Sequence, residues 1–121
     1  MSAWVWAAVA VVGGAGAIAR FALDSLIAQR AGRGFPLGTF TINATGALLL
    51  GLLTGLAVQG NAMVIAGTAT IGSFTTFSTW MFETHRLAED DDTPRATVNV
   101  LLSLGVGFGA ALLGRAIGAH A

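Results

Sequence analysis

The side chains most able to do chemistry gather between residues 67 and 82, in the sequence GTATIGSFTTFSTWMF. The central part, from Gly72 to Trp80, carries five hydroxyl side chains and three aromatic rings and has no charge. In a lipid bilayer these hydroxyls have no water to bind, so they must bond to the backbone, to one another or to a passing solute. We therefore interpret this stretch as the functional centre of the chain.

Further polar side chains lie at one-turn spacing on other apolar segments. Thr39 and Asn43 share one helical face, and Asn99, Ser103 and Gly107 share another. An Asn in a membrane helix either bonds to a neighbouring helix or presents its two N–H donors to an anion. For Asn43 we favour the anion, because Thr39 lies beside it and both can join the hydroxyl cluster. For Asn99 and Ser103, a polar track and two ordinary interhelical hydrogen bonds fit the sequence equally well.

Charged residues are confined to the ends of the apolar segments. Arg20 and Asp24 lie one turn apart, and a charge in the middle of a bilayer costs about 3 kcal/mol, so we expect them near the membrane edge or in a wet cavity. They form either a self-paired anchor or an anion entrance to which Arg20 lends positive potential. Glu83 closes the third segment at an interface, and the acidic run 89–92 is expected to be a solvated turn.

The composition restricts the class of protein. Of 121 residues, 55% are hydrophobic and 10% are charged, whereas a soluble domain carries about 25% charged residues. Six arginines balance six acidic residues and there is no lysine, which argues against a nucleic-acid surface. The lack of cysteine removes thiolate chemistry, and no histidine lies near a nucleophile, so we do not expect an enzyme.

The apolar segments predict one all-α membrane domain, residues 1–121, with four spans at about 4–27, 37–59, 62–86 and 95–118. Small residues predict close helix packing at Gly51/Gly55, at Gly105/Gly109 and along Ala110/Gly114/Gly118. The short turn at Gly60-Asn61 predicts that the second and third spans are antiparallel neighbours. So small a bundle encloses little volume, and we expect two or more copies to assemble.

The third span allows two conformations. A continuous helix would force its hydroxyls to bond within the helix, whereas a break near residues 72–78 would free backbone groups in mid-membrane, which is tolerated only beside protein or a cavity. Orientation is weakly marked. The two loops carry Arg30, Arg33, Arg86 and Arg95, against Arg115 on the other side, and this favours cytoplasmic loops.

Three pieces of the chain carry a resemblance to a known family: GGAGAIARF at 13–21, PLGTFTINATGALLLG at 36–51 and GTATIGSFTTFSTWMFE at 67–83. With four spans in about 120 residues, the sequence resembles the Fluc/CrcB fluoride channels over essentially its whole length. The resemblance implies passive, electrodiffusive export of toxic fluoride across the bacterial inner membrane. It also implies a dual-topology, antiparallel homodimer with two pores and a central structural sodium ion.

The resemblance also implies roles for individual residues. It places sodium at a break in the third helix, bound by the backbone carbonyls of Gly72 and Thr75 from both subunits. From their charge and their place near span ends, we interpret Arg20 and Glu83 as vestibule or structural charges. The fluoride pore expected from the resemblance and the hydroxyl cluster comprises Thr39, Asn43, Phe77, Ser78, Thr79, Trp80, Asn99 and Ser103.

The sequence departs from the family pattern at Trp80, where the family usually has Phe, and at Asn99 and Gly107, where it usually has an aromatic hydroxyl and a serine. The indole N–H of Trp80 could donate to an anion, or its bulk could narrow the path. The alternative function is a small four-helix proton-coupled multidrug exporter, but such a protein needs an acidic residue deep in a span, and Asp24 and Glu83 lie near helix ends. A non-transporting assembly protein would leave the hydroxyl cluster unexplained.

Overall fold

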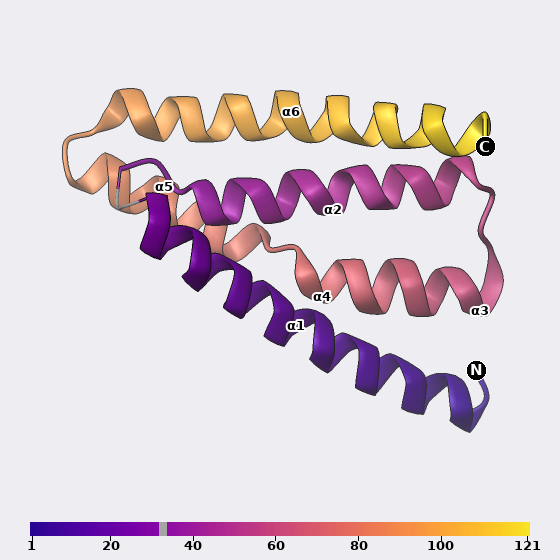
Figure 1. The fold of residues 1–121 in the computed structure, drawn as a ribbon. Helices are drawn as coiled ribbons and strands as arrows, with labels where there is room; N and C mark the ends of the chain where they lie inside the picture. Colours follow the sequence, from indigo (N-terminus) through magenta and orange to yellow (C-terminus); the bar gives the residue numbers. More distant parts are fainter. Residues whose placement is uncertain (32–33) are drawn as a thin grey trace.

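The computed structural model describes residues 1–31 and 34–121, and all regular structure in this part of the chain is helical. The elements are α1 (Ala3–Ala31), α2 (Leu37–Gly55), α3 (Gly60–Met63), the π-helix η1 (Val64–Ile71), α4 (Gly72–Phe74), α5 (Phe77–Glu89) and α6 (Thr93–Ala119). Figure 1 shows that the chain crosses the molecule in alternating directions, so both termini lie at the same end.

Among the described residues, three helices, α1, α2 and α6, are long and apolar enough to cross a membrane. Their surfaces carry many exposed large apolar side chains, as expected where the surroundings are lipid. The elements α3, η1, α4 and α5 follow one another from end to end of the molecule as an interrupted helix, which is called the third crossing below. The chain is a multi-pass membrane protein.

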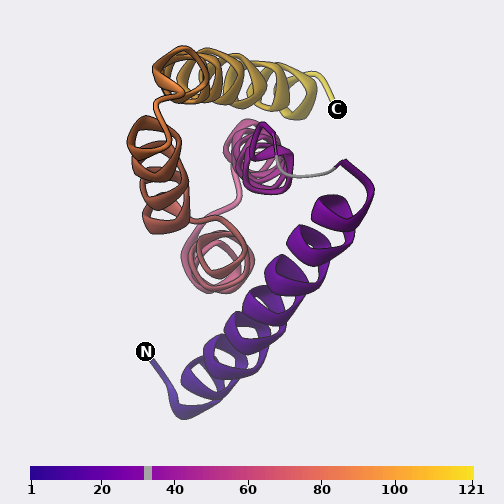
Figure 2. The ribbon, with the colours of Figure 1, turned by 90° about the vertical axis from the view of Figure 1, so that its left-hand side faces the viewer.

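Helix α2 occupies the centre of the bundle and contacts α1, η1, α4, α5 and α6 (Figure 2). Its closest neighbour is α6, because glycines let the two backbones approach. A Cβ at Gly51 would collide with the carbonyl oxygen of Ala111, and one at Gly114 would collide with the carbonyl oxygen of Leu48. This confirms the packing predicted for Gly51 and Gly114. A Cβ at Gly105 would meet nothing within 4 Å among the described residues, so that glycine faces open space.

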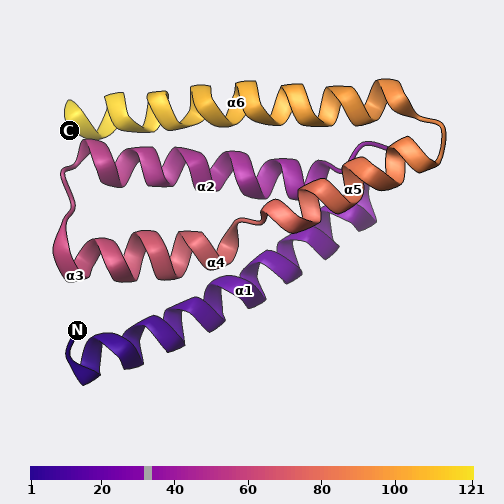
Figure 3. The same ribbon diagram turned by 180° about the vertical axis from the view of Figure 1, so that it is seen from behind.

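The third crossing changes its winding twice before the break that Figure 3 shows between α4 and α5. Residues 64–71 form a π-helix, and the Thr70 hydroxyl donates to the carbonyl of Ile65, five residues earlier, at 2.8 Å. π-Helical turns are rare and often lie beside functional sites. After α4, Thr75 and Thr76 are extended, with ψ of 161° and 124°, and α5 then begins at Phe77. The predicted break is confirmed, whereas the π-helix was not foreseen.

The ends of the helices differ from the predicted spans by a few residues. Helix α1 continues to Ala31, and α2 ends at Gly55. The connection to α3 therefore covers residues 56–59, although the two crossings are antiparallel as predicted. The acidic run is divided: Glu89 ends α5, and Asp92 caps α6 by accepting from the Arg95 N–H at 3.3 Å. Arg33, one of the arginines used to predict orientation, lies outside the described residues.

Candidate functional site

The break in the third crossing is held against α2 by the side chain of Asn43. Its Nδ2 donates to the Thr76 carbonyl at 2.8 Å, and its Oδ1 accepts from the Thr76 N–H at 2.8 Å. The Asn43 side-chain amide thus takes the place of the two backbone partners that Thr76 would have in a continuous helix. Of the two roles considered for Asn43, the interhelical bond is formed, and one Nδ2 hydrogen is left for a solute.

The two backbone carbonyls that the resemblance assigns to sodium both lose their helical donors at the break. In an unbroken helix the Gly72 carbonyl would accept from the Thr76 N–H and the Thr75 carbonyl from the Thr79 N–H. Instead, the Thr76 N–H donates to Asn43, and the Thr79 N–H donates to the Thr76 hydroxyl at 3.2 Å. Within the described chain, neither carbonyl is paired to another donor. Both are therefore free to coordinate a hard cation.

A groove of about 310 Å³ lies on one side of the break. Asn43, Thr75, Thr76, Phe77 and Trp80 line it, so four of the predicted site residues come together there. The rings of Phe77 and Trp80 meet edge to face, with centroids 5.7 Å apart and an interplanar angle of 81°. Phe77 is 70% exposed and leaves one side of the groove without a protein wall.

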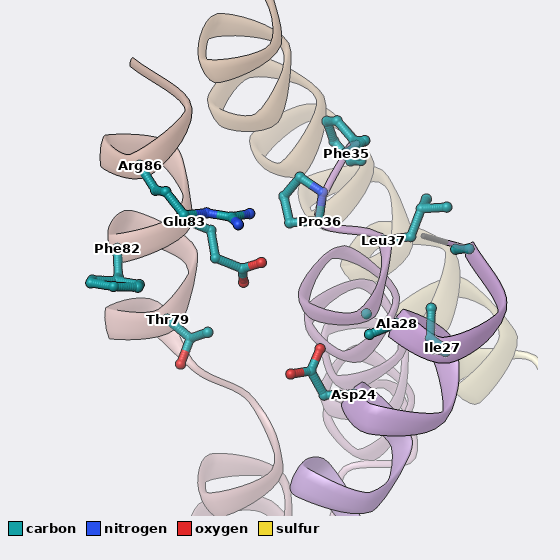
Figure 4. A pocket seen from close by; sticks show the side chains of 12 residues that line it. Asp24, Ile27, Ala28, Phe35, Pro36, Leu37, Thr79, Phe82, Glu83 and Arg86 are labelled. Carbon is teal, nitrogen blue, oxygen red and sulfur yellow. The ribbon is translucent and has the colours of Figure 1, made fainter. Parts of the chain in front are cut away.

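Two further spaces lie on the other side of the break. A pocket of about 140 Å³ is lined by Arg20, Asp24, Thr39, Thr76 and Thr79, among others. It shares Asp24 and Thr79 with a pocket of about 330 Å³ near the loop end of α1 and α5, shown in Figure 4. Thr76 lines both the 140 Å³ pocket and the groove, so these spaces follow one another past the break.

The charged residues lie at the loop end of this series. In Figure 4 Asp24 projects into the 330 Å³ pocket from one wall, and Glu83 and Arg86 project from the other. The Thr39 hydroxyl donates to Glu83, and Thr39 is only 2% exposed. Arg20 does not pair with Asp24 in the described chain, and its buried Nε has no hydrogen-bond partner there. The self-paired anchor is therefore not formed in this structure.

The side chains of Ser78, Asn99 and Ser103 lie outside these spaces, and the indole N–H of Trp80 is directed away from the groove that its ring lines. The Trp80 indole N–H donates to the Asn99 carbonyl at 3.2 Å, so it points to α6 and not to a solute. Asn99 and Ser103 line none of the three pockets, and the Asn99 Oδ1 and Ser103 Oγ atoms are buried without partners in the described chain. Ser78 is exposed, with its hydroxyl 3.4 Å from that of Thr76.

A family profile described as CrcB-like protein, Camphor Resistance (CrcB), matches residues 7–115. The chain belongs to the CrcB-like family. A relative from Mycolicibacterium paratuberculosis, named Fluoride-specific ion channel FluC 2, is 49% identical over 111 residues, which cover 92% of this chain and 91% of the relative. Fluoride-specific ion channel FluC 1 of Symbiobacterium thermophilum is 45% identical over 119 residues, covering 93% and 96%. FluC 1 of Leifsonia xyli is 42% identical over 123 residues, covering 98% and 89%.

Membership of the CrcB-like family confirms the resemblance seen in the three sequence pieces. The relatives are named as ion channels, which agrees with the prediction that the chain is not an enzyme. Two residues that organise the site were not singled out from the sequence. Thr76 is bonded to Asn43 and caps α5, and Thr84 bonds to both Trp80 and Asn99. In the sequence, Thr84 could have been identified by its position one helical turn after Trp80.

Proposed function

We propose that the chain is a passive channel for fluoride, as the names of its relatives suggest. The observation that best supports this is the break itself, where uncharged donors and an aromatic pair surround the junction of two cavities. Fluoride is small and strongly hydrated, so a path must replace its water with several donors at once. Donors without a fixed charge allow the ion to leave again.

The order of the cavities suggests a route for the ion. It would enter the 330 Å³ pocket near Arg86, reach the 140 Å³ pocket beside Arg20, and pass Thr76 into the groove. The hydroxyls of Thr76 and Thr79 and the spare N–H of Asn43 lie along this route. The positive edges of the Phe77 and Trp80 rings would complete the shell in the groove.

A second copy in the inverted orientation would close the open side of the groove. Phe77 is exposed in the single subunit, and so is Gly72 at the start of the break. Gly105 and Gly109 also face open space, where another backbone could approach. An inverted pair would give two equivalent pores. The opposite orientation of the two copies would also explain why the arginine bias between the loops is weak.

The donor set at the break is suited to a structural sodium ion. The carbonyls of Gly72 and Thr75 lack helical donors, and sodium is a hard cation that prefers such oxygens. Two carbonyls from each copy would supply four oxygen ligands. When bound, the ion would offset the negative ends of these carbonyl dipoles. The chain itself orients them, because Asn43 and Thr76 capture the N–H groups that would otherwise compete.

Ion efflux from liposomes tests the proposal. Purified protein in potassium fluoride-loaded vesicles should release fluoride far faster than chloride, without proton movement. Phe77→Ile should reduce fluoride efflux sharply, because the ring edge that faces the groove is lost. The matched control is Phe108→Ile, which removes an equally exposed ring from α6, where it lines none of the three spaces. Equal fluoride and chloride efflux would contradict the proposal, and proton flux driven by a cationic drug would favour the multidrug exporter.

A further inference from the structure

Three hydrogen bonds form a closed ring between α5 and α6. The Trp80 Nε1–H donates to the Asn99 carbonyl at 3.2 Å, and the Asn99 Nδ2 donates to the Thr84 hydroxyl at 2.8 Å. The Thr84 hydroxyl in turn donates to the Trp80 carbonyl at 2.8 Å. The ring therefore returns to the residue at which it starts, and it joins the side chain and the backbone of Trp80 to the same position on α6.

The burial of this ring makes its geometry specific. Asn99 is only 1% exposed, and a polar group in such surroundings loses much if its partner is removed. The ring also restricts the rotation of the indole, because the N–H must remain directed at α6. Another aromatic side chain in place of Trp80 could fill the same space, but no hydrogen bond would fix its χ angles.

The orientation of the indole determines the shape of the groove. Trp80 lines the groove and meets Phe77 edge to face, with 5.7 Å between ring centroids. A rotation of the indole would move the edge that faces Phe77 and change the width between them. Asn99 itself is poorly suited to bind an anion, because it lines none of the three spaces and its unpaired buried atom is the acceptor Oδ1.

We propose that Asn99 and Thr84 are positioning residues that act through Trp80, and that they determine the selectivity of the groove among halides. The inference rests on the proposed anion-channel function. It assigns Asn99 a role different from direct contact with the ion, and it includes Thr84 as the residue that joins the two ends of the ring. The physical basis is that the width of an anion path, set by a fixed ring edge, distinguishes small from large ions.

The first test is spectroscopic. Replacing the exposed Trp4 and Trp6 with Phe leaves Trp80 as the only tryptophan, which can be labelled as 5-fluorotryptophan. Thr84→Val should shift and broaden its ¹⁹F resonance, because the indole is released, and Thr84→Ser should restore it. Thr54→Val is the matched control, since the Thr54 hydroxyl makes the same bond to the carbonyl four residues earlier, at 2.9 Å, but is exposed on α2. An unchanged resonance in Thr84→Val would overturn the proposal.

The second test is a double-mutant comparison of halide selectivity in liposomes. Thr84→Val and Trp80→Phe should each lower the fluoride-to-chloride permeability ratio about three- to tenfold, the equivalent of one hydrogen bond. Thr84→Val should have no further effect in the Trp80→Phe background, because Thr84 acts through the indole. Independent, multiplicative effects would overturn the proposal. If the parent protein conducts no fluoride, the channel function fails, while the ¹⁹F resonance still decides whether the ring orients Trp80.

Discussion

The bridge between Asn43 and Thr76 gives the most direct prediction. Asn43→Ala removes both hydrogen bonds, each 2.8 Å long, and leaves the N–H and the carbonyl of Thr76 without partners. An unsatisfied buried backbone group costs about 1–3 kcal/mol. Both groups lie beside the open groove, where water can partly replace Asn43, so we expect a total cost of about 2 kcal/mol. That energy corresponds to about a thirtyfold change in the population of the native break.

Two measurements on Asn43→Ala separate the bridge from a direct contact with the ion. Fluoride efflux from liposomes should fall at least tenfold, and the Thr76 amide should exchange its hydrogen faster by about the same thirtyfold factor. Thr54→Val, on the same helix but without a partner on another helix, should change neither quantity. A loss of efflux with unchanged exchange at Thr76 would refute the reasoning, because Asn43 would then act on the ion alone.

Three further predictions concern the packing and the break. Thr75→Ser keeps the backbone carbonyl but loses the methyl group that packs against Gly46. Fluoride efflux should therefore stay within about twofold, and the free energy of unfolding in detergent should fall by about 1 kcal/mol. A severe loss of efflux would argue against a backbone cation site. Thr76→Val removes the acceptor for the Thr79 N–H and should cost ~1 kcal/mol, seen as faster exchange at Thr79, whereas Thr76→Ser should preserve protection. Gly51→Val should prevent α2 from packing on α6 and lower the yield of folded protein. Gly105→Ala should fold, because Gly105 has open space around it. Equal yields of the two variants would contradict the close approach of α2 and α6.

The residues alone identified the third span as the functional centre but left a continuous and a broken helix open, and the family resemblance placed the break. Five uncharged hydroxyls following Gly72 must bond to something, and within an apolar segment the backbone is the nearest partner. The shared face of Thr39 and Asn43 was also predictable from one-turn spacing. The spacing did not reveal what lies opposite each residue, which is Glu83 for the first and Thr76 for the second.

Packing partners were the part that the sequence could not supply. Gly105/Gly109 and Gly114/Gly118 have the same spacing, yet only the second pair meets the backbone of α2, because contact depends on where the neighbouring helix lies. Trp80 illustrates the same limit. Its indole N–H had two possible uses in the sequence, and the distance to the Asn99 carbonyl decides that it is bonded to α6.

The π-helix from Val64 to Ile71 has a consequence for chain length. Its wide turns accommodate more residues along the same axial distance than an α-helix does, and they determine the angle at which Gly72 leaves the helix. Removing one residue from this segment would let it wind as an ordinary α-helix and would leave the face that Thr76 presents to Asn43 largely in place. Removing one residue from the α-helical turn on either side has no such outlet, and it would rotate everything after it by about 100° about the axis. We therefore expect single-residue deletions to be tolerated within residues 64–71 and not in the turns that flank them.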